Sequence, residues 1–120
     1  MLTVLVVDDS LVIRKVLSEM LEKLGHKVVG KAKNGRESID LYEKLKPDLV
    51  TMDITMPIMS GIKALTAIRG KYQNAIVVMV TSHGEEKLVM DAISSGAKGF
   101  ILKPLNEERI KNVIEKIFKK

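Results

Sequence analysis

Two kinds of apolar pattern alternate along the chain. Short runs rich in valine and isoleucine, typical of β-strands, occur at residues 3–7, 27–32, 48–52, 75–81 and 99–102. Between them, apolar residues recur every three or four positions, which predicts amphipathic helices. These predicted helices cover about residues 12–24, 35–45, 62–69, 84–95 and 110–118. The pattern therefore predicts a strand followed by a helix, five times over.

Helix-boundary residues support these elements. Three glycines are expected to end helices, because glycine readily adopts the left-handed conformation that follows a helix: Gly25, Gly70 and Gly96. Two pairs have the spacing of a capping box: Asn34 with Glu37, and Ser82 with Glu85. In a capping box, a polar side chain caps the helix, and a glutamate three residues later accepts a hydrogen bond from the backbone amide of the capping residue. Asn106, followed by two glutamates, predicts the start of the last helix.

Alternating strands and helices predict an α/β fold with a parallel sheet covered by helices on both faces. The strands at 3–7, 48–52 and 75–81 are almost continuously apolar, which indicates burial on both faces. The strand at 27–32 contains lysines and a glycine and is expected at an edge of the sheet. A chain of 120 residues is expected to form one domain, residues 1–120.

Ligands of such sheets bind at the carboxyl ends of the strands. Charged and hydroxyl side chains follow four of the predicted strands: Asp8 and Asp9, Asp53, Thr81 and Ser82, and Lys103. Each alone has an ordinary explanation, as a helix cap or a solvated side chain, but together they predict a site. Asp48 begins the third strand, about 17 Å from Asp53 at ~3.3 Å per residue, so we assign it no role there.

Three carboxylates at the carboxyl end of one sheet repel one another unless a cation binds between them. Oxygen ligands without cysteine or histidine favour Mg²⁺, Mn²⁺ or Ca²⁺ over zinc. A lysine beside a cation is unfavourable unless an anion joins them, and a phosphoryl group would satisfy the metal, the Lys103 ammonium and a hydroxyl together. Asp53, on the central strand, is the best-placed nucleophile, since carboxylates can accept phosphoryl groups as aspartyl phosphate.

The amino-acid composition argues against several classes of binding partner. The net charge of +5 could suggest binding to nucleic acid, but the basic residues alternate with acidic ones along the chain. Only two Tyr and two Phe are available to stack on nucleic-acid bases. We therefore expect no nucleic-acid binding. The absence of cysteine excludes disulfides and thiolate metal sites. No apolar run approaches the ~20 residues of a membrane span, and the first residues lack a basic leader, so we expect a cytoplasmic protein without membrane contact.

Four motifs resemble one known family. They are "VVDDS" at 6–10, "VTMDITMPIMSG" at 50–61, "VMVTS" at 78–82 and "GAKGFILKP" at 96–104. In order and spacing they are similar to those of a response-regulator receiver domain, over essentially the whole chain, and most similar to its single-domain chemotaxis members. The resemblance implies a flavodoxin-like (βα)5 three-layer sandwich with strand order 2-1-3-4-5. It also implies a phosphorylation-activated switch of a two-component system.

The resemblance implies a role for each site residue. Asp53 would accept a phosphoryl group from a histidine kinase. Asp8, Asp9 and Asp53, with the backbone carbonyl of Thr55, would bind Mg²⁺. Lys103 would pair with the phosphoryl group and Thr81 would hydrogen-bond it. Self-phosphorylation and self-dephosphorylation would then be the protein's only catalysis, so it is not expected to be an enzyme.

Further positions complete the implied switch. Movement of Thr81 would free space for Phe100, which would change the surface made by the predicted helix at 84–95, the strand at 99–102 and the last helix. Many family members have tyrosine at the position of Phe100; the missing hydroxyl is expected to bias the ring inward even without phosphate. Thr55 and His83 would tune reaction rates. Pro57 and Gly61 would shape their loop, and the Lys103–Pro104 bond is commonly cis in the family.

The implied partners are a histidine kinase, with a flagellar-motor switch protein and a phosphatase as candidates, acting on a monomer. A phosphorelay intermediate or the receiver part of a transcriptional regulator is the alternative within the family. A flavodoxin-like redox carrier is disfavoured, because the loop after the first strand is acidic and would repel a flavin phosphate. An aspartyl phosphatase would generally have a second aspartate where this chain has Thr55.

Overall fold

A computed structural model describes residues 1–119. Its elements alternate between strand and helix throughout: β1 (Thr3–Val7), α1 (Leu11–Lys23), β2 (Lys27–Ala32), α2 (Gly35–Leu45), β3 (Leu49–Met52), α3 (Gly61–Lys71), β4 (Val77–Thr81), α4 (Glu86–Ser94), β5 (Gly99–Leu102) and α5 (Glu107–Ile117). Every predicted element is present. The largest boundary difference is at α5, which begins three residues earlier than expected. The starts of β4 and α4 and the end of α3 each lie two residues later than expected.

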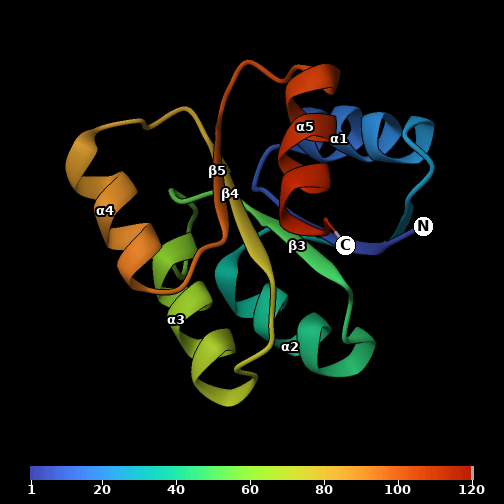
Figure 1. Cartoon of the computed structure of the whole chain (residues 1–120). Coiled ribbons are helices and arrows are strands. Elements are labelled where there is room, and N and C mark those ends of the chain that lie inside the picture. The colour runs from blue at the N-terminus through green and yellow to red at the C-terminus, as the bar shows by residue number, and fades with distance from the viewer. Residues whose placement is uncertain (120) are drawn as a thin grey trace.

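The five strands form one parallel sheet in the order β2-β1-β3-β4-β5. Helices α2, α3 and α4 lie on one face of the sheet, and α1 and α5 lie on the other (Figure 1). This is the expected flavodoxin-like (βα)5 three-layer sandwich. No helix within residues 1–119 combines the length and the apolar character that crossing a membrane requires.

The core consists of two apolar layers, one on each face of the sheet. Alternate residues of β1 point to opposite faces, as the strand geometry requires: Leu5 and Val7 pack into one layer, and Val4 and Val6 into the other. All residues of β3 and β4 are buried, whereas β2 is partly exposed at one edge of the sheet. The continuous apolar runs of the central strands are explained by these two layers.

Most predicted helix ends are confirmed. Asn34 accepts a hydrogen bond from the Glu37 amide (2.8 Å), and Asn106 accepts one from the Arg109 amide (2.9 Å), so both cap their helices. Ser10 caps α1 in the same way. Gly25 and Gly96 follow the last residues of α1 and α4 with positive φ angles, which glycine adopts without steric cost.

Two predicted boundaries are wrong. Gly70 lies inside α3, which continues to Lys71; the Tyr72 amide still donates to the carbonyl of Ile68. The Ser82–Glu85 capping box does not form, because α4 begins only at Glu86 and has no side-chain cap. Residues between Thr81 and Glu86 instead form an irregular loop beside the carboxyl end of β4. Sequence spacing alone could not distinguish this loop from a first helical turn.

The amino end of the sheet carries structural polar contacts. Asp48 accepts hydrogen bonds from the backbone amide (2.8 Å) and hydroxyl (3.0 Å) of Thr3, which joins the starts of β1 and β3. The His26 ring accepts one from the Leu2 amide (3.2 Å). Burial, and then the positive charge of the chain's N-terminus, lower the pKa of His26. Asp48 therefore lies at the opposite end of β3 from Asp53, as predicted.

Candidate functional site

The pairing of β1 with β3 brings two aspartates side by side. Val7 and Met52 are partners in the sheet, and each is followed at once by an aspartate, Asp8 or Asp53. The ladder continues one step further, since the Asp53 amide donates to the Val7 carbonyl (3.0 Å). The chain passes from β1 into α1 on one face of the sheet and from β3 toward α3 on the other face, so the two connections diverge at this end of the sheet (Figure 1). Ligands of parallel sheets bind where neighbouring connections diverge in this way.

Three carboxylates meet at this end of the sheet. Asp8, Asp9 and Asp53 each offer an oxygen within 4.8 Å of the others. Asp8 is 2% exposed and Asp53 7% exposed, whereas Asp9 is exposed. Two buried carboxylates this close repel each other strongly unless a cation compensates them. The arrangement therefore requires positive charge.

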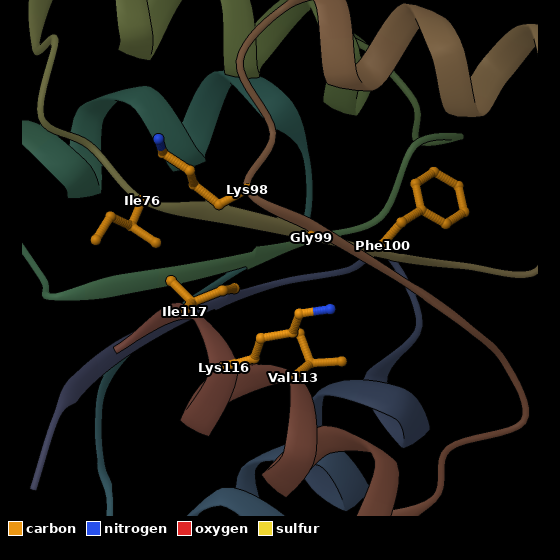
Figure 2. A pocket seen from close by; sticks show the side chains of 7 residues that line it. All are labelled: Ile76, Lys98, Gly99, Phe100, Val113, Lys116 and Ile117. Carbon is orange, nitrogen blue, oxygen red and sulfur yellow. The ribbon is translucent and has the colours of Figure 1, made fainter. Parts of the chain in front are cut away.

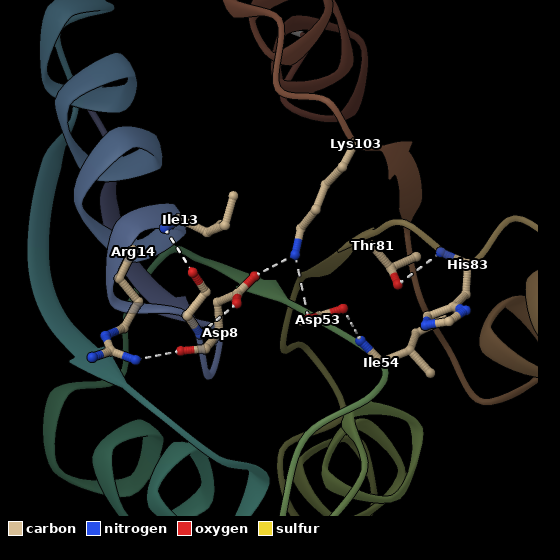
Figure 3. Close-up of polar contacts among 9 residues, drawn as sticks. Asp8, Ile13, Arg14, Asp53, Ile54, Thr81, His83 and Lys103 are labelled. Carbon is tan, nitrogen blue, oxygen red and sulfur yellow. Dashed lines mark hydrogen bonds and ion pairs between the residues drawn. The ribbon is translucent and has the colours of Figure 1, made fainter.

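Lys103 supplies part of that charge. The Lys103 amide continues the β4–β5 ladder by donating to the Thr81 carbonyl (2.9 Å), which places the side chain at the same end of the sheet. Its Nζ lies 2.8 Å from Asp8 Oδ2 and 3.3 Å from Asp53 Oδ2, so it bridges the two buried acids (Figure 3). Burial by itself lowers the pKa of Lys103, but the hydrogen bond to Asp8 and the charges of both aspartates outweigh it and raise the pKa.

The other carboxylate oxygens are held by backbone amides. Asp8 Oδ1 accepts from the Ser10 amide (2.9 Å), and Asp53 Oδ1 accepts from the Ile54 amide (2.8 Å). In addition, Arg14 Nη1 donates to the backbone carbonyl of Asp8 (2.7 Å; Figure 3). Sequence reasoning missed Arg14, because an arginine six residues beyond Asp8 and inside a helix carries no recognisable signal. The two buried acids are thus fixed in orientation.

Thr81 is the last residue of β4, at the same end of the sheet. It is fully buried, and its hydroxyl accepts a hydrogen bond from the His83 amide (3.2 Å; Figure 3). The His83 ring is partly exposed and lies 3.8 Å from a Glu85 carboxylate oxygen. The Thr81 hydroxyl is therefore engaged with its own loop, and the loop's conformation depends on that bond.

The loop after β3 packs tightly against Asp53. The Gly61 amide donates to the Ile54 carbonyl (2.7 Å), and a Cβ atom at Gly61 would lie 1.9 Å from the Asp53 carbonyl oxygen. Ile58, at the tip, has a left-handed φ of 71°, an uncommon conformation for a β-branched residue. Thr55 and Pro57 lie in this loop, and both are exposed. The Lys103–Pro104 peptide bond on the neighbouring loop is cis.

Phe100 lies away from the acids, on β5. Its ring is partly buried and packs against the layer beneath α2, α3 and α4. Beside it, between β5 and α5, is a hollow of about 560 Å³, lined by Ile76, Lys98, Gly99, Phe100, Val113, Lys116 and Ile117 (Figure 2). The inward bias expected of Phe100 stays a prediction.

The donor set suits a hard divalent cation. All three clustered groups are carboxylates, the ligands that Mg²⁺ and Ca²⁺ prefer, and the sequence contains no cysteine. Asp9, the exposed member, borders solvent, so a bound ion could keep several waters as Mg²⁺ usually does. The residues at this site thus fit a magnesium ion that shares the buried acids with Lys103.

Comparisons with known proteins agree with this geometry. The family model for the response regulator receiver domain matches residues 4–115. The chain is 43% identical to the chemotaxis protein CheY of Thermotoga maritima over 116 residues, which is 97% of each protein. It is 44% identical to protein CcdB of Bacillus subtilis over 117 residues, 98% of each. The match favours a signalling receiver over the redox carrier and the aspartyl phosphatase.

A solved structure gives the same result. The chain is similar to a protein from Borrelia burgdorferi whose crystal structure is described as a CheX–CheY–BeF₃–Mg²⁺ complex. The TM-score is 0.95 and the identity 38%, with 98% of this chain and 90% of that one covered. Fold, site and relatives agree: the chain belongs to the response regulator receiver domain family and is a CheY-like signalling switch.

Proposed function

We propose that Asp53 accepts a phosphoryl group from the phosphohistidine of a histidine kinase, and that this reaction sets the switch. One observation carries the proposal. Asp53 is buried at the carboxyl end of the sheet with Asp8 beside it, and the Lys103 ammonium bridges the two carboxylates. A nucleophile, a metal-binding carboxylate and a fixed cation thus lie together at one site.

The transfer needs an anionic nucleophile and compensation of developing negative charge. A carboxylate oxygen of Asp53 attacks phosphorus; the new O–P bond forms while the N–P bond breaks. The N–P electron pair stays on the imidazole nitrogen, which is protonated from water. Lys103 stabilises the phosphoryl oxygens by moving its hydrogen bond from Asp53 to one of them. The buried position of Asp53 excludes much of the competing water.

Mg²⁺ would be held by the carboxylates of Asp8, Asp9 and Asp53 with the Thr55 carbonyl, and it would neutralise charge on the phosphoryl oxygens. The three-carboxylate cluster supports this ligand set, as does the Mg²⁺ in the Borrelia complex. We expect Mn²⁺ or Ca²⁺ to substitute. The chain's own catalysis would be limited to this self-phosphorylation and the later self-dephosphorylation, with Thr55 and His83 setting the rates.

The switch would begin at Thr81. A phosphoryl oxygen on Asp53 is a stronger acceptor than a neutral group and attracts the Thr81 hydroxyl. Thr81 would then reorient, and the loop that its hydroxyl now holds through the His83 amide would move with it. Phe100 would turn into the vacated space, changing the face formed by α4, β5 and α5. A local hydrogen bond thereby biases a packing arrangement with two states.

We further propose that the receiver unit spans residues 1–120 and works as a cytoplasmic monomer, in chemotaxis. Its partners would be a histidine kinase, with a flagellar-motor switch protein and a phosphatase as further candidates. The relatives named CheY and the Borrelia complex that contains CheX support this assignment.

Incubation with acetyl phosphate and Mg²⁺ tests the proposed chemistry. Acetyl phosphate is a small phosphoryl donor that bypasses the kinase. We expect one added phosphoryl group per chain in the intact-mass spectrum, and none when EDTA removes the metal. Unchanged mass with Mg²⁺ present, in a sample shown to be folded by circular dichroism, would contradict the proposal.

A further inference from the structure

We propose that Arg14 is a positioning residue for the metal site: its hydrogen bond to the Asp8 carbonyl orients Asp9 toward the ion. This inference rests on the proposed magnesium site. It concerns a residue of α1 whose own side chain would not touch the metal. The carrying observation is the 2.7 Å hydrogen bond from Arg14 Nη1 to the carbonyl oxygen of Asp8.

That carbonyl belongs to the peptide group joining Asp8 to Asp9. The preceding peptide is fixed by the sheet, because the Asp8 amide donates to the Ala32 carbonyl (3.0 Å). Beyond Asp8 the ladder has ended and α1 has not yet begun. A change in the ψ angle of Asp8 would turn this peptide group and swing Asp9 while leaving the strand intact. Arg14 holds the plane from the carbonyl side.

The two acids differ in how they are held. The Asp8 carboxylate is fixed at both oxygens, by the Ser10 amide and by Lys103. Asp9 is exposed, so surrounding side chains do not fix it by burial. Its contribution to the cluster therefore depends on the backbone that presents it. Groups that orient metal ligands in this way typically change metal affinity about 10–100-fold when they are removed.

Arg14 is itself well placed to act as a rigid support. Its amide donates to the Ser10 carbonyl (3.0 Å), so its backbone lies in the first turns of α1. Ser10 caps the same helix, and its amide donates to the Asp8 carboxylate. Asp8, Ser10 and Arg14 thus form a closed ring of hydrogen bonds. The planar guanidinium loses little further freedom when it makes this bond.

Charge alone predicts the opposite effect of removing Arg14. A guanidinium near the acids repels Mg²⁺, so loss of its charge would tighten metal binding if electrostatics dominated. Loss of its hydrogen bond would weaken binding if orientation dominated. The two explanations differ in sign, which makes the experiment decisive.

The test is Mg²⁺ binding by isothermal titration calorimetry, with the metal alone. We expect Arg14→Met to weaken binding about tenfold. Arg14→Lys, which keeps a donor on a side chain of similar length, should stay within about threefold of wild type. Lys15→Met is the matched control: it removes an exposed positive charge one residue away and should bind as wild type or slightly more tightly.

Unchanged or tighter binding by Arg14→Met would overturn the inference. So would an equal loss in Arg14→Lys, since the donor would then not matter. If Arg14→Met fails to fold, Arg14→Gln, whose side chain is two bonds shorter, carries the same expectation. Wild-type protein that binds no Mg²⁺ would refute the proposed metal site itself, a result distinct from failure of the Arg14 inference alone.

Discussion

Replacing Lys103 by methionine is expected to destabilise the metal-free protein by about 3 kcal/mol. The Lys103 ammonium lies between Asp8 Oδ2 (2.8 Å) and Asp53 Oδ2 (3.3 Å), and methionine keeps most of the side-chain volume without the charge. Two buried carboxylates would then face each other uncompensated. The free energy of unfolding is measured by urea denaturation in EDTA.

Magnesium should restore much of this loss. If the acids form a cation site, Mg²⁺ replaces the missing ammonium and binds the variant more tightly than wild type, because the competing charge is gone. Millimolar Mg²⁺ should therefore raise the unfolding free energy of Lys103→Met more than that of wild type. Phosphorylation from acetyl phosphate should still be slow, since the stabilising ammonium is missing.

Two further variants isolate the cause. Asp53→Asn in the Lys103→Met background removes one of the facing charges and should recover stability in EDTA. Lys98→Met is the matched control: Lys98 is an exposed lysine that lines the hollow beside α5, and its loss should change stability by no more than about 0.5 kcal/mol. A Lys103→Met protein as stable as wild type in EDTA would show that the acids need no compensation.

Gly61→Ala is expected to be the most damaging small substitution in the chain. Its added methyl group would lie 1.9 Å from the Asp53 carbonyl oxygen and 3.0 Å from the Ile54 Cα, both backbone atoms that no side-chain rotation can relieve. The loop must move, and the hydrogen bond from Gly61 to the Ile54 carbonyl is lost or strained. We expect a loss of about 3 kcal/mol by urea denaturation and a parallel loss of phosphorylation rate.

Gly70→Ala is the control for this substitution. Gly70 lies inside α3, and a methyl group there would meet nothing within 4 Å beyond the backbone of its own helix and its chain neighbours. The change should stabilise the protein by about 0.5–1 kcal/mol, through helix propensity. If Gly61→Ala were tolerated equally well, the tight contact between this loop and Asp53 could not be what fixes the acceptor.

The sequence was sufficient where one physical signal dominated. The continuous apolar runs at residues 3–7 and 75–81 predicted buried strands, and the strands predicted at 3–7 and 99–102 placed Asp8 and Lys103 at one end of the sheet. Asn34 and Asn106 cap helices as predicted, because a side chain and an amide three residues apart interact locally. The strand order required the family resemblance, since periodicity does not determine which strands are neighbours.

The failures arise where tertiary contacts override local preference. Ser82 and Glu85 have capping-box spacing, yet the loop is held by the Thr81 hydroxyl and α4 starts later. Gly70 is a plausible helix end, but the Tyr72 amide continues the helical hydrogen bonding and the Tyr72 ring packs at a tilt against Tyr42 of α2. The hydrogen bond of Arg14 could not be predicted from the sequence, because its acceptor is a backbone carbonyl, a group that every residue has.

Phosphoryl transfer to Asp53 is the step on which the proposed switch depends. The direct test is tandem mass spectrometry of peptides from protein treated with acetyl phosphate and Mg²⁺, comparing wild type, Asp53→Asn and Asp48→Asn. We expect a phosphoryl group on Asp53 in wild type and in Asp48→Asn, and none in folded Asp53→Asn. A phosphoryl group on another residue of the wild-type protein, or full phosphorylation of Asp53→Asn, would contradict the assignment of Asp53 as the acceptor.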